Sequence, residues 1–253
     1  MIYKKNADNI VNASAHVTEQ LLKENLPSRP VIIKPNIVNP SLSPVTTDAR
    51  VVEGIIRALR EHDIHDIVVA EGSGTGDTLD NFNRLGFSGL GVRLIDLDKE
   101  ATVTLPVKNH LVWNEITIPK IVLDTCIISV PVLKEHSMCG VTISLKNMVG
   151  ILSAQRYAGY WTYKKSEIHR HNTDECIADI ISVIKPDLAV VDATVGMKGS
   201  HLSGTPCDPP IHLVYGSTDP LEADKFGCDL LKRNWREIKH LKIIDGKTHS
   251  PCL

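Results

Sequence analysis

The chain has 253 residues, of which 42% are hydrophobic and 23% are charged, and this balance is that of an ordinary globular protein rather than of a disordered one. Its length suffices for one large α/β domain or two small ones. The formal net charge is −2, so no overall basic field would draw the protein to nucleic acid or to an anionic membrane. A binding site for an anion would have to be local.

The first ten residues, MIYKKNADNI, carry basic side chains with no apolar stretch behind them. A secretory signal peptide is therefore not expected, and no apolar run approaches the length of a membrane span. We predict a cytoplasmic protein that binds neither membranes nor nucleic acid.

The cysteines show neither a CxxC pair nor the spacing of a ferredoxin-like iron–sulfur motif. There are six of them: Cys126, Cys139, Cys176, Cys207, Cys228 and Cys252. In a cytoplasmic protein we expect reduced thiols, mostly serving as small core residues. We also expect no iron–sulfur cluster from this chain alone.

Helices are predicted where apolar residues recur at helical spacing or where capping residues stand together. In chain order these are Ile10-Ala13-Val17-Leu21, Val52-Ile55-Ile56-Leu59, Ile177-Ile180-Ile181-Ile184, and a helix that begins at Asp219-Pro220. Thr47 is the predicted N-cap of the second helix, with Asp48 in its first turn. Asn172 and Glu175 have the spacing of a capping box for the third.

Between the helices lie short runs rich in β-branched residues, at 31–33, 66–70, 92–96, 126–132, 188–192 and 211–215. Several are apolar on both faces, as are the strands of a parallel sheet that helices cover on both sides. The alternation predicts an α/β protein with a mainly parallel sheet flanked by helices. We predict a single domain over 1–253, in which the less regular stretch from about 101 to 171 is a candidate for a smaller second lobe.

Polar side chains stand where these strands end. In strand order they are Lys34 and Asn36, Glu71, Lys134 and His136, Asp192, and Thr218 and Asp219. Because ligands bind beyond the carboxyl ends of parallel strands, we expect these residues to converge on one edge of the sheet. Lys146 and Asn147, within the apolar run VTISLKNMVGIL, could join them. Burying an unpaired ammonium is expensive, so the lysines must reach water or meet an anion.

Each of these residues also has a structural interpretation. A lysine at a strand end can extend to water, Asp219 fits a helix N-cap better than a catalyst, and Asp192 can bind the turn after its strand. Three lysines in apolar contexts are stronger evidence together than any one alone. We therefore predict a lysine-lined cleft that binds a small anion.

The glycine-rich turn EGSGTGD (71–77) could aim backbone N–H groups at a phosphate. It lacks both the GK[ST] ending of a P-loop and the GxGxxG spacing of a dinucleotide-binding turn. A tight turn that needs positive φ explains it nearly as well.

His169 and His171, in EIHRHN, suggest a metal site together with His136 and a carboxylate such as Glu71. An HxH pair in a loop is a weak signature, and the HExxH motif is absent. These three histidines stay secondary candidates, and our main prediction includes no metal. The aromatic segment YAGYWTY (157–163) is predicted to be a lid over the cleft or a contact surface.

The stretches VIIKPNIV, TTDARVVEGIIRAL, VVAEGSG, PVLKEH, GVTISLKNMVGIL and LAVVDATVGMKGS with the following SGTP resemble the domain-of-unknown-function 362 family. The resemblance runs from about residue 30 to 231. Some members carry an added ferredoxin-like iron–sulfur module, whose cysteine spacing this chain lacks. The family's TT segment often continues with His-Pro, whereas Asp48-Ala49 follows here. The positions that match are Lys34, Asn36, Thr47, Glu71, Lys134, His136, Lys146, Asn147, His169 and Asp192.

The resemblance implies no particular reaction. Our first hypothesis is an enzyme that acts on a small carboxylate or phosphate metabolite. Its charge would meet Lys34, Lys134 and Lys146, while the remaining binding groups would come from Asn36, Thr47, Asn147 and Asp192. His136 or Glu71 would transfer a proton, and clustered lysines could depress one another's pKa and create an amine nucleophile.

Two alternatives stay open. The first is a non-catalytic binding or electron-transfer accessory that works with a separate iron–sulfur redox partner. The second is a metal-dependent enzyme that uses His136, His169 and Glu71. The sequence names neither a cofactor nor a substrate.

Overall fold

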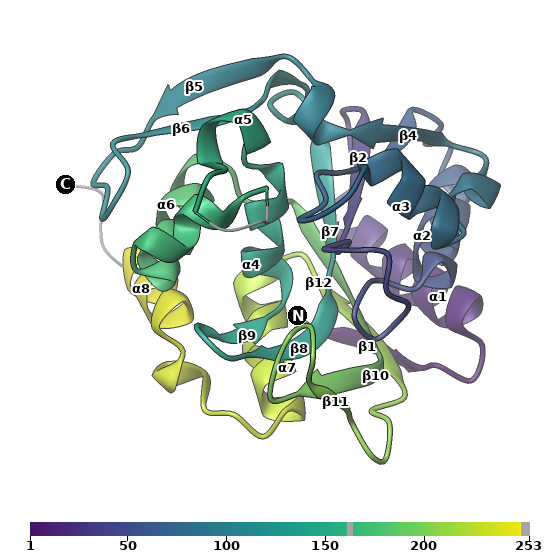
Figure 1. The fold of residues 1–253 in the computed structure, drawn as a ribbon. Helices are drawn as coiled ribbons and strands as arrows, with labels where there is room; N and C mark the ends of the chain where they lie inside the picture. The colour runs from purple at the N-terminus through teal and green to yellow at the C-terminus, as the bar shows by residue number, and fades with distance from the viewer. Residues whose placement is uncertain (161–163, 249–253) are drawn as a thin grey trace.

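The computed structural model describes residues 1–160 and 164–248. Within this part of the chain, the main sheet has ten strands and its central order is β1-β12-β10-β7-β2-β3-β4 (Figure 1). The strands are β1 (Tyr3–Asn6), β2 (Val31–Pro35), β3 (Ile67–Glu71), β4 (Arg93–Asp96), β7 (Cys126–Val130), β8 (Val132–His136), β9 (Gly140–Thr142), β10 (Leu188–Lys198), β11 (Thr205–Pro206) and β12 (Leu213–Ser217). The predicted α/β class with a mainly parallel sheet flanked by helices is confirmed.

The strands at the centre of the sheet are parallel. β2 pairs in parallel with β3 and β7, and β7 pairs in parallel with β10. β12, in contrast, runs antiparallel to β10, so its carboxyl end lies at the opposite edge. The expectation that Thr218 and Asp219 join the other strand ends is therefore wrong, because strand direction decides the edge and the sequence of one strand does not encode it.

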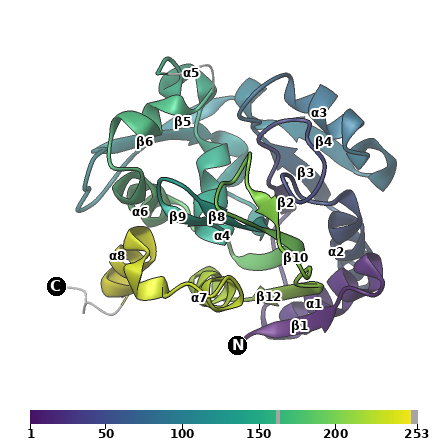
Figure 2. The same ribbon diagram turned by 60° about the horizontal axis from the view of Figure 1, so that its bottom comes forward.

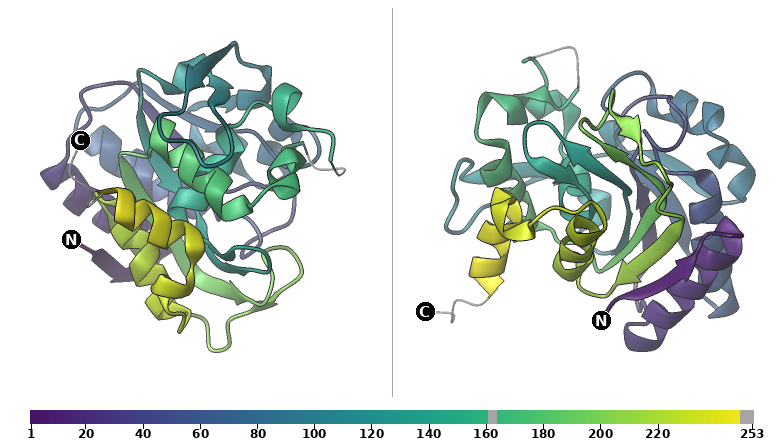
Figure 3. Two further views of the ribbon diagram at one scale, coloured as in Figure 1. Left: turned by 90° about the vertical axis from the view of Figure 1, so that its left-hand side faces the viewer. Right: turned by 90° about the horizontal axis from the view of Figure 1, so that it is seen from below.

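Two layers of helices cover the sheet (Figures 2 and 3). The helices are α1 (Ile10–Glu24), α2 (Ala49–Glu61), α3 (Thr78–Arg84), α4 (Ser144–Asn147), α5 (Ala154–Tyr157), α6 (Thr173–Val183), α7 (Pro220–Leu230) and α8 (Lys239–Thr248). α1 and α2 pack against one face, where Val31 and Ile33 belong to their core cluster. α6, α7 and α8 surround the other face, whose cluster takes Ile32 from the same strand. Alternate residues of β2 thus pack into two separate hydrophobic cores, one on each face of the sheet.

The N-cap residues of two helices are the ones that the sequence predicts, and the N-cap of a third helix is a different residue. Asn172 caps α6 and Asp219 caps α7, with Pro220 in the first turn, so both predictions are confirmed. The N-cap of α2 is Asp48, whose side chain accepts the Arg50 N–H, and not Thr47. The Thr47 hydroxyl is occupied instead by β-strand backbone, which leaves the capping position to the next residue.

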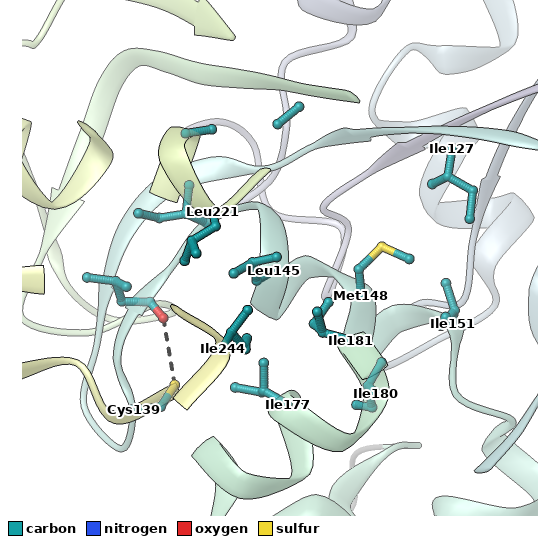
Figure 4. Packing of buried hydrophobic residues seen from close by; sticks show 14 of the residues in the cluster. Ile127, Cys139, Leu145, Met148, Ile151, Ile177, Ile180, Ile181, Leu221 and Ile244 are labelled. Carbon is teal, nitrogen blue, oxygen red and sulfur yellow. Dashed lines mark hydrogen bonds between the residues drawn. The ribbon is translucent and has the colours of Figure 1, made fainter. Parts of the chain in front are cut away.

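The short helix α4 packs into the hydrophobic core on the side of the sheet that α6, α7 and α8 cover (Figure 4). Leu145 and Met148 point inward and are fully buried, beside Ile177 and Ile181 of α6 and Ile244 of α8. Apolar contacts on this side hold α4 against the sheet. The intervening polar residues of α4 are thereby fixed toward the strand ends.

Residues 102–119 include a small separate sheet formed by β5 (Thr102–Pro106) and β6 (Glu115–Pro119). Asp179 of α6 is fully buried, and its carboxylate accepts the backbone N–H groups of Leu111, Val112 and Trp113 at 2.8–2.9 Å. One buried side chain thus holds the connection between the two strands. The single domain over 1–253 and the second lobe at about 101–171 stay predictions.

In the part of the chain that the structure describes, no helix is both long enough and apolar enough to cross a membrane. The five cysteines described there are buried free thiols, as the sequence predicts for core residues. Cys252 lies outside the described residues.

Replacing Asp179 tests the role of its carboxylate. Asp179→Ala removes the acceptor of three backbone N–H groups, and we expect the free energy of unfolding to fall by about 2–3 kcal/mol. Urea denaturation measures this loss. Asp229→Ala, at an exposed position of α7, is the matched control and should stay within about 0.5 kcal/mol of the parent. Equal losses in the two variants would contradict the anchoring role.

Candidate active site

A cavity of about 180 Å³ lies beside the carboxyl ends of β2 and β3. It is bounded by β8, by α4 and by loops from distant parts of the chain. Three lysines and three histidines line it: Lys134, Lys146, Lys165, His136, His169 and His201. The volume is below the range of about 300–1,000 Å³ that is usual for drug-sized ligands, so the space suits a small molecule.

Below the cavity, Lys34 and Glu71 form a buried ion pair. Their side chains are 1% and 3% exposed, and Lys34 Nζ lies 2.5 Å from Glu71 Oε2. Lys34 Nζ also donates to Asn147 Oδ1 at 3.1 Å, while Asn147 Nδ2 donates to the Lys34 carbonyl and to Ser129 Oγ. Burial lowers the pKa of Lys34 and raises the pKa of Glu71, and the opposite charge of each partner counteracts both changes.

Glycines let the backbone approach these buried charges. A Cβ at Gly150 would overlap Glu71 Oε1 and would lie 2.7 Å from Lys34 Nζ. A Cβ at Gly72, in the turn after β3, would overlap Lys165 Nζ. The glycine-rich turn therefore accommodates a lysine from elsewhere in the chain, a reason for its composition that the sequence does not show.

Lys134 is held without a carboxylate contact. Its Nζ donates to Asn36 Oδ1 and to the Val45 carbonyl, both at 2.7 Å, and the side chain is 1% exposed. Burial and, to a smaller extent, the nearby charge of Lys146 lower the pKa of Lys134 to about 7, and the charge of Asp192 opposes the change. An amine with this pKa exchanges its proton near neutral pH.

Lys165 has its own counter-charge. Its Nζ lies 2.8 Å from Asp98 Oδ1 and donates to the Gly72 carbonyl at 2.8 Å. Burial lowers the pKa of Lys165, and the charge of Asp98 opposes this effect. Lys165 thus contributes to the wall of the cavity as half of an ion pair.

Lys146 has no such partner. α4 is fixed by Asp224 of α7, whose carboxylate accepts the Ser144 and Leu145 N–H groups at 2.8 and 3.1 Å. This attachment holds the half-buried Lys146 at the cavity. Among the described residues, no hydrogen bond or ion pair holds the Lys146 ammonium. Its charge lowers the pKa of Lys134 and of the histidines around it.

The three histidines are neutral at physiological pH. Burial is the largest cause in each case, and it lowers the pKa of His169 to about 4, that of His201 to about 3 and that of His136 further still. The rings of His136 and His201 stack with centroids 3.9 Å apart. His136 Nδ1 accepts the Met138 N–H at 3.1 Å, which leaves the proton of the neutral ring on Nε2.

Besides Lys34, two predicted binding residues lie outside the cavity lining, namely Thr47 and Asp192. Thr47 accepts the Asn36 N–H and donates to the Val130 carbonyl, so it positions Asn36. Asp192 accepts the Asp48 N–H on the face that α2 covers, and it accepts from both the N–H and the hydroxyl of Thr194. Burial raises the pKa of Asp192.

The histidine pair of the metal hypothesis is separated. His169 lines the cavity, whereas the His171 ring makes an edge contact with Trp113, at a centroid distance of 5.9 Å. Adjacent odd positions on an irregular segment need not face the same way, and here they do not. Within 1–160 and 164–248, no group of three or more His, Cys, Asp or Glu side chains is arranged to hold a metal ion.

The predicted aromatic lid is only partly described. Tyr157 ends α5 and is buried against Trp113, with ring centroids 4.9 Å apart, so it is a packing residue. Residues 161–163 lie outside the described residues, and a lid there stays a prediction.

Two of the lysines and histidines that line the cavity were not predicted. Lys165 directly follows another lysine beside the aromatic segment, a pattern that is typical of an exposed turn. Its partner Asp98 is distant in sequence, so no local motif indicates the ion pair. His201 lies in the loop after β10 and belongs to no motif. Only the fold brings either residue to the strand ends.

Residues 31–229 match the family described as Domain of unknown function (DUF362). The chain belongs to this family. The match begins at β2 and ends within α7, so it includes every cavity residue described above. The comparison with curated proteins and with solved structures found no match for the chain.

Removing one member of the buried ion pair tests its energetic role. Lys34→Met leaves the Glu71 carboxylate buried without its cation, and we expect a loss of about 3–5 kcal/mol in the free energy of unfolding at pH 8. Without Lys34 the folded protein holds Glu71 as the neutral acid, so its stability falls as pH rises from 5 to 8. Chemical denaturation at the two pH values measures this.

The double variant Lys34→Met/Glu71→Gln is the control, since it also removes the carboxylate charge. It should recover much of the stability at pH 8 and lose the dependence on pH. A double variant as unstable as the single one would contradict a charge-based explanation.

Proposed function

We propose that this DUF362 protein is an enzyme that binds a small anionic metabolite, a carboxylate or a phosphate, in the lysine-lined cavity. The observation that carries the proposal is the Lys146 ammonium, which lies at the cavity beside Lys134 with no ion pair among the described residues. An anion between the two lysines would relieve their repulsion.

The charge balance of the cavity supports an anionic ligand. Glu71 is paired with Lys34, and Asp98 is paired with Lys165. These two carboxylates are thus already matched by cations, while Lys134 and Lys146 contribute positive charge beyond them. Because Lys134 is buried, such charge attracts anions more strongly than the same lysines would on the surface.

Neutral groups around the two lysines would orient the ligand. Asn36 and the Nε2–H of His136 offer oriented polar contacts, and neither adds a competing charge. A neutral imidazole donor close to a reactive amine suits proton transfer to a carbonyl or phosphoryl oxygen. This combination favours an enzyme over a simple anion carrier.

The two alternatives stay predictions. Co-purification with an iron–sulfur protein would favour an electron-transfer accessory, and stoichiometric metal in protein purified without an affinity tag would favour the metal-dependent enzyme.

Anion-dependent stabilisation tests the proposal. Sulfate binding at one hundred times its dissociation constant adds about 2.7 kcal/mol to stability. We expect Lys146→Met to lose most of this gain, because the variant keeps the apolar stem and removes the charge. Thermal melts across a sulfate titration, with chloride holding ionic strength constant, measure the effect.

Lys108→Met, which removes an exposed lysine, is the matched control and separates site binding from the general stabilising effect of sulfate. It should respond to sulfate like the parent. If Lys146→Met also responds like the parent, Lys146 does not contact the anion.

The pKa of Lys134 predicts how binding depends on pH. Lys134 is charged below pH 7 and becomes neutral above it, so sulfate affinity should fall by about tenfold from pH 6 to pH 8. His169 and His201 stay neutral throughout this range and add no slope. Calorimetric titration measures the affinity, and sulfate keeps its charge across the range. Lys134→Arg should bind with little pH dependence.

A further inference from the structure

The lysines of the site differ in what their nitrogen atoms contact. Lys34 contacts the carboxylate of Glu71 at 2.5 Å, and Lys165 contacts that of Asp98 at 2.8 Å. Contact with a carboxylate favours the ammonium form, which has no lone pair and cannot attack an electrophile. Among the residues that the structure describes, the Nζ of Lys134 donates only to an amide oxygen and a carbonyl oxygen.

The two contacts of Lys134 fix the geometry of its nitrogen. A neutral amine has two N–H groups and one lone pair around the bond to Cε. Asn36 Oδ1 and the Val45 carbonyl, each 2.7 Å from Nζ, accept the two N–H groups. The remaining tetrahedral position is left for the lone pair, and Lys134 lines the cavity. These two oxygens thus orient a free amine as well as they orient an ammonium.

The surroundings also favour the free amine. The side chain is 1% exposed, and burial disfavours its charged form. Lys146 adds a positive charge nearby, and its own ammonium is available to hold an anionic group. His136 is two residues further along β8 and lies on the same face of the strand. An amine, a cation and a neutral N–H donor therefore line one small cavity.

We propose that Lys134 is an amine nucleophile that forms a Schiff base with a small 2-oxo carboxylate, whose carboxylate group binds Lys146. The inference rests on the proposed function, because it assigns a substrate class to the same cavity. Lys134 Nζ attacks the ketone carbon, and the carbonyl oxygen becomes a hydroxyl as it takes one amine hydrogen. The second amine hydrogen leaves with that hydroxyl as water, and a C=N bond remains.

Reductive trapping tests this assignment. The full chain is incubated with pyruvate and sodium cyanoborohydride at pH 7, and the hydride converts a C=N bond into a stable secondary amine. Intact mass and peptide mapping then locate the adduct. We expect it at Lys134 at a rate at least ten times that at any other lysine. The N-terminal amine is the internal standard for an uncatalysed amine.

Two further measurements separate the nucleophile from the anion site. Lys134→Arg keeps the charge and removes the nucleophile, so it should lose the adduct and keep its thermal stabilisation by sulfate. Lactate has the carboxylate of pyruvate but no ketone; it should raise the melting temperature and slow trapping in the parent. The parent's peptide map decides the question even if the variant fails to fold.

The outcomes distinguish the two proposals. An adduct spread over exposed lysines, or one found only at the N-terminus, overturns the Schiff-base assignment. If sulfate and lactate still raise the melting temperature in that case, the anion site stands without the nucleophile. If neither adduct nor anion-dependent stabilisation is found, both the assignment and the proposed function fail.

Discussion

The cost of burying a lysine ammonium is the constraint on which the site depends. Lys34 is 1% exposed at the carboxyl end of β2. Glu71 supplies the opposite charge from β3, and Asn147 supplies a further acceptor from α4. Because an unpaired charge there would be strongly destabilising, these three residues also fix the positions of β2, β3 and α4 relative to one another. The close approach then requires glycine at 150.

The same constraint gives each lysine of the cavity a different character. Lys34 and Lys165 are ion-paired, Lys34 below the cavity and Lys165 in its wall. Lys134 is buried among neutral oxygens, so its pKa falls to about 7. Lys146 lies on a short helix that Asp224 holds in place, and it adds its charge to the cavity without a carboxylate beside it. One residue type thus supplies structural ion pairs, a titratable amine and the charge that we propose binds an anion, and the contacts of each nitrogen decide which.

Hydrophobic packing and site geometry are coupled through α4. Leu145 and Met148 belong to the core between the sheet and α6, α7 and α8 (Figure 4). Lys146 and Asn147, in contrast, line the cavity at the strand ends. Apolar residues next to polar ones in a single helical turn therefore perform both tasks. The region that matches the family, residues 31–229, includes this helix and the strands around it. The chemistry proposed for the cavity depends on this local arrangement and not on the fold class, which many unrelated functions share.

The layered α/β architecture could be predicted from local sequence, because apolar periodicity and capping residues act over a few neighbouring positions; the caps Asn172 and Asp219 are examples. Local sequence also indicated Lys34, Glu71, Lys134, His136 and Lys146 as candidate site residues, because polar groups beside apolar runs are costly to bury without a partner. Only the tertiary structure decided which charges pair, that Asp192 faces α2, that His171 turns away, and that Lys165 and His201 reach the cavity. Side-chain pairing and strand direction, such as that of β12, depend on contacts between residues far apart in the chain. Such contacts cannot be predicted from local sequence.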